Sequence, residues 1–232
     1  MKVSQTHASA CGRTASLLCT LVFLMSLAGC TSPRLEHEIR DKPIGPGYEP
    51  QNIFAVGELP EGFQRVLVLP PTDPDGDPLS AELVDALLAS LRQAGRFEVL
   101  PSGEAYRAIS SLSGEAPLVS KGPVPAAVLE EAARMGADGI LELHMTHYRP
   151  YKPLQVGLRG RLISLADEGQ VLWEIDELFD AGQKRVATGA RRYAETYMEQ
   201  PFPLQSSYSV LMSPLRFTRY VGQMAFETLP PQ

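Results

Sequence analysis

The order of strand-like and helix-like segments constrains the fold of this chain more than any other feature. A short apolar run at 65–70, stopped by two prolines, is typical of a buried strand. Apolar residues at helical spacing follow over 79–91, and we expect that helix to start with Asp77 as N-cap and Pro78 at its first position, and to end at Gly95. Because a helical crossover joins parallel strands, the first strands should pair in parallel.

The second half of the sequence predicts three consecutive strands joined by short turns, which favours an antiparallel meander. The remaining expected elements are a strand at 97–100 and helices at 102–112, 125–135, 182–199 and 205–229, the last kinked or split by Pro214. The meander strands are expected at 139–148, 155–165 and 170–180. The fold class is therefore α/β (α+β): a mixed sheet of about five strands with helices packed on it, in the order β-α-β-α-α-β-β-β-α-α.

Alternation within these segments also predicts part of the core. Trp173 shares a strand face with its apolar neighbours two residues away on each side, so its ring should face the helices. The helix that follows the first strand should meet that sheet through Leu83, Leu87 and Leu91.

The amino-terminal segment has the pattern of an export signal. Leu17–Ala28 is an apolar run of 12 residues broken only by Thr20 and Ser26, too short for a spanning helix, which needs roughly 20 residues. It ends in Leu27-Ala28-Gly29-Cys30, which resembles a bacterial lipoprotein signal. The resemblance implies cleavage between Gly29 and Cys30 and acylation of Cys30. In that family an aspartate directly after the cysteine often retains the lipoprotein in the inner membrane. The residue at that position here is Thr31, which favours the outer membrane.

These features divide the chain into three expected parts: a lipoprotein signal peptide over 1–29, a lipidated cysteine with a flexible tether over 30–62, and a single periplasmic α/β domain with carboxy-terminal helices over 63–232. Five prolines and four glycines between 31 and 62 interrupt any helical or strand period. The apolar patch at 53–56 is expected to dock on the domain as an edge strand, and the alternative is that it engages a partner.

Four short motifs carry a second resemblance, at the level of the domain. They are Val66-Leu-Val-Leu-Pro-Pro71, Gly95-Arg-Phe-Glu-Val99, Ala133-Arg-Met-Gly-Ala-Asp-Gly-Ile-Leu141 and Gly169-Gln-Val-Leu-Trp173. Their order resembles a superfamily of periplasmic α/β domains that includes the curli-secretion lipoprotein and the amino-terminal domain of the Tol-system translocation protein. The superfamily also includes polysaccharide-export lipoproteins and lipoprotein activators of peptidoglycan synthases. The connection at 149–153, between the expected strands at 139–148 and 155–165, is too short to cross a bilayer. We therefore do not expect this chain to form a transmembrane pore.

The inventory of reactive side chains argues against catalysis. All three cysteines, at positions 11, 19 and 30, lie at or before the expected cleavage site. His144 and His147 are three apart on an expected strand, which should place them on opposite faces and prevent them from binding one metal unless the strand bulges. The aspartates at 73, 75 and 77 resemble the start of a calcium loop, but Pro78 and Val84 occupy its glycine and glutamate positions. We therefore expect no enzyme activity, no metal and no cofactor.

A partner surface is the remaining hypothesis. Arg159 and Arg161 point to one side of a strand, and aromatic residues concentrate in the last third of the chain, so Arg159, Arg161, Tyr208 and Tyr220 are the candidate partner residues. The alternatives are a solvated basic stripe and a set of core aromatics. A net charge of -6 does not favour nucleic acid.

The function expected from these observations is that of an outer-membrane-anchored periplasmic lipoprotein acting as a non-enzymatic assembly or export accessory. Its expected partners are membrane lipid, through acylated Cys30, and envelope proteins, with self-association left open. A lipoprotein regulator of a cell-wall synthase is the alternative, and a periplasmic hydrolase is disfavoured.

Overall fold

The computed structural model describes residues 43–100, 124–166, 169–198 and 207–232. These residues belong to one compact unit that runs from Pro43 to Gln232. The expected lipidation site at Cys30 and the expected helix at 102–112 lie outside the described residues.

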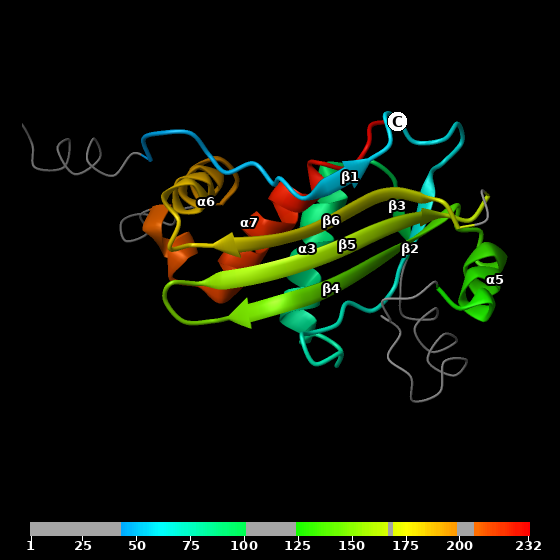
Figure 1. Ribbon diagram of the computed structural model, residues 1–232, viewed down its shortest axis with the longest axis horizontal. Helices are drawn as coiled ribbons and strands as arrows, with labels where there is room; N and C mark the ends of the chain where they lie inside the picture. The colour runs from blue at the N-terminus through cyan, green and yellow to red at the C-terminus, as the bar shows by residue number, and fades with distance from the viewer. Residues whose placement is uncertain (1–42, 101–123, 167–168, 199–206) are drawn as a thin grey trace, which may run out of the picture. The chain divides into compact units, whose positions relative to one another are not determined.

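One six-stranded mixed sheet forms the centre of the unit, with the strands in the order β1-β6-β5-β4-β2-β3 (Figure 1). The strands are β1 (Ile53–Ala55), β2 (Arg65–Val68), β3 (Glu98–Leu100), β4 (Gly139–Arg149), β5 (Gln155–Ser164) and β6 (Val171–Asp180). β2 pairs in parallel with both β3 and β4, whereas β4, β5 and β6 form an antiparallel meander and β1 joins β6 antiparallel. The predicted mixed sheet is confirmed, and its strand count is six because β1 adds an edge.

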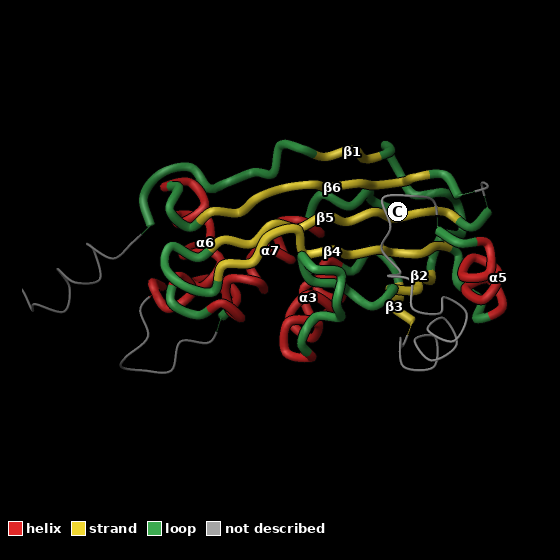
Figure 2. Tube along the Cα trace, turned by 60° about the horizontal axis from the view of Figure 1, so that its bottom comes forward, coloured by secondary structure: helices red, strands yellow, loops and turns green. Residues whose placement is uncertain are grey.

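Helices cover the two faces of this sheet unequally. The helical elements are α3 (Ala81–Ala94), α5 (Ala126–Arg134), α6 (Lys184–Tyr197), a 3₁₀ turn η1 (Ser207–Leu211) and α7 (Pro214–Phe226). In Figure 2, α3 and α7 lie on one side of the sheet. α5 packs on the other face, where Val128 and Ala132 join Leu67 and Ile140 in a smaller core. Pro214 occupies the first turn of α7, which confirms the predicted split of the last segment.

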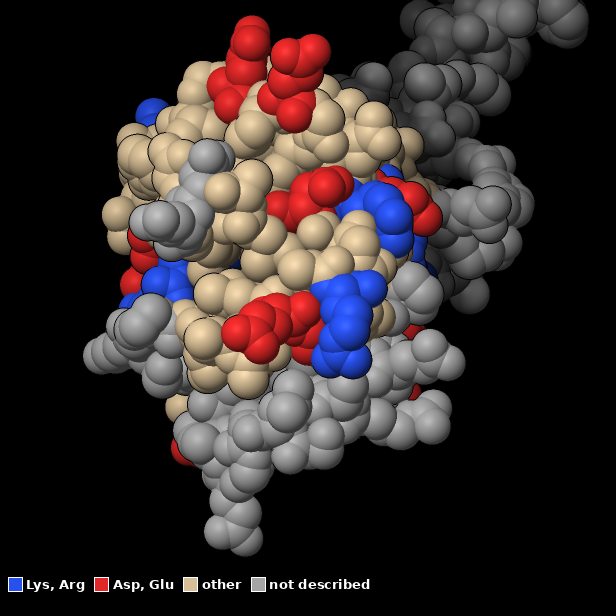
Figure 3. Space-filling view, turned by 90° about the vertical axis from the view of Figure 1, so that its right-hand side faces the viewer, with Lys and Arg blue, Asp and Glu red and all other residues tan. Residues whose placement is uncertain are grey.

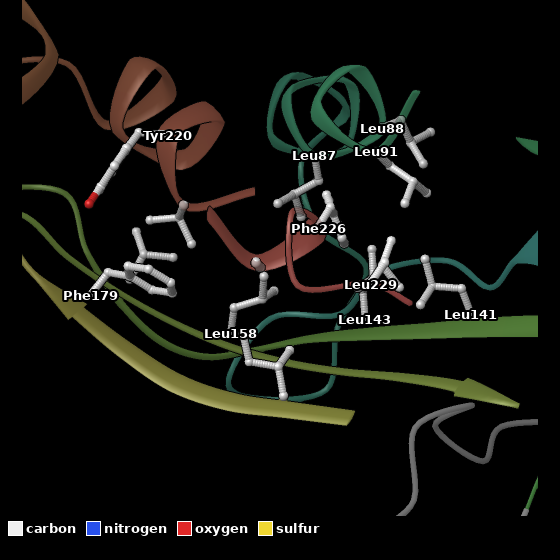
Figure 4. Close-up of a cluster of buried hydrophobic side chains, with 14 of the residues drawn as sticks. Leu87, Leu88, Leu91, Leu141, Leu143, Leu158, Phe179, Tyr220, Phe226 and Leu229 are labelled. Carbon is white, nitrogen blue, oxygen red and sulfur yellow. The ribbon is translucent and has the colours of Figure 1, made fainter. Parts of the chain in front are cut away.

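The main core lies between the sheet and α3, α6 and α7 (Figure 4). Trp173 is fully buried, and its indole Nε1 donates a hydrogen bond to Thr228 Oγ1 at 2.9 Å, so the ring faces the helices as predicted. The three leucines of α3 are buried, again as predicted. α3 ends at Gly95, whose φ of 64° is a left-handed conformation that glycine adopts without steric strain.

The segment from Pro43 to Gly62, which falls in the expected tether, belongs to the compact unit. β1 pairs with β6, which confirms that the apolar patch docks as an edge strand. The Tyr48 ring meets the Phe179 ring edge to face at 5.5 Å. Prolines and glycines limit regular structure here, but the apolar side chains between them still pack.

Glu177 fastens this segment to β6. Its carboxylate accepts hydrogen bonds from the backbone N–H groups of Gln51 and Asn52, at 2.7 and 3.1 Å. Partial burial acts to raise the pKa of Glu177, but the hydrogen bonds from Gln51, Tyr48 and Asn52 outweigh it and lower that pKa. The ionised carboxylate is therefore the form that holds the segment in place.

The helix start predicted at Asp77 and Pro78 is wrong. α3 begins at Ala81, after Ser80. Asp73 instead organises a turn, because its Oδ1 accepts hydrogen bonds from the backbone N–H groups of Asp75 and Asp77, each at 2.9 Å. An aspartate that bonds the backbone a few residues ahead stabilises a turn as readily as a helix start, and here the turn prevails.

Candidate interaction surface

The face of β4, β5 and β6 that turns away from α3 and α7 is the candidate interaction surface of the unit. Figure 1 looks onto this face, with β4 to β6 in front of α3 and α7. Among the described helices, only α5 packs on it, at the end near β2. We call the remainder the open sheet face. Its side chains come from Phe54, Glu142, His144, His147, Arg159, Arg161, Glu174, Asp176 and Leu178.

Two arginine–carboxylate pairs cross the strands of the open sheet face. Arg161 donates from Nε and Nη2 to Glu142 Oε2, at 2.8 and 2.6 Å. Arg159 donates in the same way to Asp176 Oδ2, at 3.0 and 2.6 Å. The predicted shared side of the two arginines is confirmed. They do not, however, form a basic stripe, because each is neutralised by an acid on a neighbouring strand.

The two pairs differ in their environment. Glu142 is buried, and this burial raises the pKa of its carboxyl group although Arg161 acts to lower it. Removing Arg161 would leave a buried carboxylate without its cation, which is a strongly destabilising change. The side chains of Arg159 and Asp176 are 35% and 39% exposed, so their pair contributes little to stability and can exchange partners with an incoming surface.

A bulge in β4, the exception left open by the sequence analysis, determines where the histidines lie. The register of β4 shifts between Met145 and His147, so His144 faces Arg159 and His147 faces Gly157. Positions 157 and 159 lie on one face of β5, so the β-bulge places both histidines on the open sheet face, and the predicted opposite faces are wrong.

The shared face does not create a metal site. His144 Nδ1 lies 2.8 Å from Thr72 Oγ1, whereas His147 Nε2 lies 3.1 Å from Gln155 Oε1. Burial, with the Arg159 charge, lowers the pKa of His144, so that ring is neutral near pH 7. Within the part of the chain that the structure describes, no group of three or more His, Cys, Asp or Glu side chains is arranged to hold a metal ion.

Two exposed apolar side chains lie on the same strand face as the Arg159–Asp176 pair. Phe54 projects from the edge strand β1 with 54% of its surface exposed, and Leu178 projects from β6 with 45% exposed. Both are on the same face as Asp176. Exposed apolar and aromatic groups next to arginine are the composition that protein interfaces favour. Phe54 belongs to the apolar patch at 53–56, for which the sequence leaves a partner contact as the alternative to docking. Leu178 is not among the candidates predicted from sequence.

The two aromatic candidates do not join this surface. Tyr220 is fully buried in the helical layer, so its prediction as a partner residue is wrong: its ring packs against Phe217 and Phe179. Tyr208 is 44% exposed on η1, but the Arg191 guanidinium stacks over its ring at 3.8 Å. The four candidate residues therefore lie on two different layers.

Charges elsewhere on the unit are also mixed. Figure 3 looks at the end that carries α5 and shows basic side chains lying beside acidic ones. The Glu131–Arg134 ion pair on α5 is one example. The described residues on this face present no single-sign patch of the kind that binds a polyelectrolyte. No described helix is both long and apolar enough to span a membrane.

Comparison with known proteins yields structural likeness only. No family model and no curated protein matches the chain. The PelC dodecamer from Paraburkholderia phytofirmans is 14% identical with a TM-score of 0.43, and the match covers 78% of this chain and 96% of that one. Lipoprotein GNA1162 from Neisseria meningitidis is 20% identical with a TM-score of 0.34, and the match covers 50% of this chain and 79% of that one. The LpoB C-terminal domain from Escherichia coli is 20% identical with a TM-score of 0.37, and the match covers 50% of this chain and 82% of that one. None of these likenesses assigns a function to this chain.

Proposed function

We propose that this chain is a lipid-anchored envelope protein that acts as a non-enzymatic accessory and binds an envelope protein through the open sheet face. The observation that carries the proposal is the juxtaposition of Phe54 and Leu178 with the exchangeable Arg159–Asp176 pair. Such a surface offers apolar anchors and a polar group that can re-pair, which is what a protein partner requires.

The anchor half of the proposal rests on the sequence motif that ends in Cys30. Residues from Pro43 onward belong to the compact unit, so only residues 31–42 separate that cysteine from it. A stretch of this length spans at most about 40 Å when fully extended. This short reach favours a partner close to the membrane over a cell-wall synthase on the far side of the periplasm.

Two substitutions on the same face separate binding from chemistry. Leu178→Arg should abolish complementation of a deletion strain, because a charge replaces an apolar anchor at the interface. His144→Ala should leave complementation intact, because an accessory protein needs no acid–base group at that position. Met212→Arg, at a residue 59% exposed on the helical side, is the matched control and should also complement. All variants are compared at equal expression.

Two outcomes would contradict the proposal. If Leu178→Arg complements as well as Met212→Arg, the open sheet face is not the partner surface. If His144→Ala is folded and exported but inactive, the non-enzymatic interpretation is wrong.

A further inference from the structure

A cavity of about 440 Å³ lies in the helical layer, between α3, α6 and α7. Its volume is within the range of small-molecule sites, roughly 300–1,000 Å³. The residues that matter in its lining are Ser90, Gln93, Tyr193, Tyr197, Arg216 and Arg219. Because the cavity is on the opposite side of the sheet from the open sheet face, a ligand bound in it is independent of the proposed function.

Two guanidinium groups line the cavity. Arg216 and Arg219 are three residues apart on α7, which makes them neighbours on one helix face. Arg216 Nη1 donates to Ser209 Oγ at 2.7 Å, a neutral partner. Among the described residues, no carboxylate lies within 4.0 Å of either guanidinium. No acid of the described chain therefore neutralises the positive charge at the cavity, and carboxylates and phosphates are the groups that the planar guanidinium of arginine binds best.

The acid that follows the last residue of α7 is already hydrogen-bonded. Glu227 accepts a hydrogen bond from Gln223 Nε2 at 2.8 Å. It influences the site only at a distance, by adding slightly to the pKa rise that burial imposes on Tyr193, while the Arg219 charge opposes that rise. At neutral pH the phenol is therefore protonated and can donate a hydrogen bond into the cavity.

Two tyrosines form an aromatic wall. The rings of Tyr193 and Tyr197 have centroids 5.3 Å apart and planes inclined by 38°. Tyr193 is buried, but Tyr197 keeps 53% of its surface exposed at the cavity. An exposed ring beside a polar cavity suits a ligand with one flat apolar face and polar edges. Gln93 adds an amide that can both donate and accept.

We propose that this cavity binds an anionic sugar unit. A carboxylate or phosphate on the sugar would pair with Arg216 and Arg219, the C–H face of its ring would lie against Tyr197, and its hydroxyls would bond to Gln93. A simple anion would use the arginines alone and a neutral sugar would use Tyr197 and Gln93 alone, whereas an anionic sugar uses all of these groups.

Titration calorimetry on the full chain in detergent tests this proposal with four probes: glucuronic acid, glucose 6-phosphate, glucose and inorganic phosphate. We expect binding of one or both anionic sugars, at least about tenfold tighter than glucose or phosphate, because one charge-assisted contact accounts for a factor of this order. The two anionic sugars distinguish a carboxylate from a phosphate. Absence of binding by both, or equal binding of inorganic phosphate, would overturn the proposal.

Three variants locate the site. Arg219→Ala should weaken the anionic sugar at least about tenfold, whereas Arg192→Ala, an equal change in charge at an exposed position of α6 outside the cavity, should leave affinity unchanged. Tyr197→Ala should weaken the sugar but not the residual affinity for phosphate. Equal effects of Arg219→Ala and Arg192→Ala would show general attraction by charge and would contradict a site in this cavity.

Discussion

Leu87→Ala should lower the free energy of unfolding by about 2–5 kcal/mol, because truncating a fully buried leucine removes apolar contact and leaves a cavity. Leu87 is 0% exposed at the centre of α3, and Figure 4 shows it between that helix and Phe226. Typical domains are stable by only about 5–15 kcal/mol, so the loss is a large share of the total. The melting temperature should fall by roughly 4–20 °C in a calorimetric scan.

Leu178→Ala is the matched control for that change. The same atoms are removed at a residue that is 45% exposed on the open sheet face, so stability should change by less than about 1 kcal/mol. If Leu87→Ala were no more destabilising than Leu178→Ala, α3 would not pack against the sheet as described.

Cys30→Ala should abolish acylation and release the chain from the membrane fraction. The motif Leu27-Ala28-Gly29-Cys30 motivates the prediction, since its resemblance to a lipoprotein signal implies that the thiol of Cys30 receives the lipid. Labelling with a radioactive fatty acid, followed by fractionation, measures both effects. Cys19→Ala, within the preceding apolar run, is the control and should still be acylated. A Cys30→Ala variant that incorporates fatty acid would refute the lipoprotein signal.

The sheet and its helices could be predicted because their signals are local. Alternation around Trp173 predicts which face of β6 is buried, and the helical spacing of Leu83, Leu87 and Leu91 predicts the face of α3 that meets the sheet. Pro214 correctly indicates where the last segment divides. The start of α3 could not be predicted in the same way, because an aspartate before a proline is compatible with either a turn or a helix N-cap, and only the surrounding contacts decide between them.

The surface could not be predicted to the same extent, because it depends on register between strands. The pairs Arg159–Asp176 and Arg161–Glu142 join residues 17 and 19 positions apart in the sequence. Counting outward from the turn at Gly169 places Asp176 opposite Arg159, so the sequence carries a signal for that pair. The same count places Glu174 opposite Arg161 and does not indicate the pair that Arg161 forms with Glu142 of β4. The bulge that brings His144 and His147 to one face leaves no comparable trace, because nothing in the local pattern marks where a strand gains a residue.

The burial of Tyr220 shows a related limit. An amphipathic helix pattern indicates that one side of the helix is apolar, but it does not indicate which of its aromatic side chains are buried in the core. Tyr220 meets Phe179 of β6 and Tyr193 of α6, two contacts that come from distant parts of the chain. Tyr208 and Tyr197 remain exposed.

Thiol protection at position 178 is the sharpest test of a partner on the open sheet face. The three cysteines of the chain lie at 11, 19 and 30, so Leu178→Cys introduces a thiol that is unique within residues 31–232. If a partner covers this face, a small maleimide should label Leu178→Cys at least several-fold more slowly in intact cells than in the purified protein. Met212→Cys, on the helical side, should react equally in both settings. Equal labelling of Leu178→Cys in cells and after purification would contradict the proposed partner surface, because it would show that nothing occupies this face in the envelope.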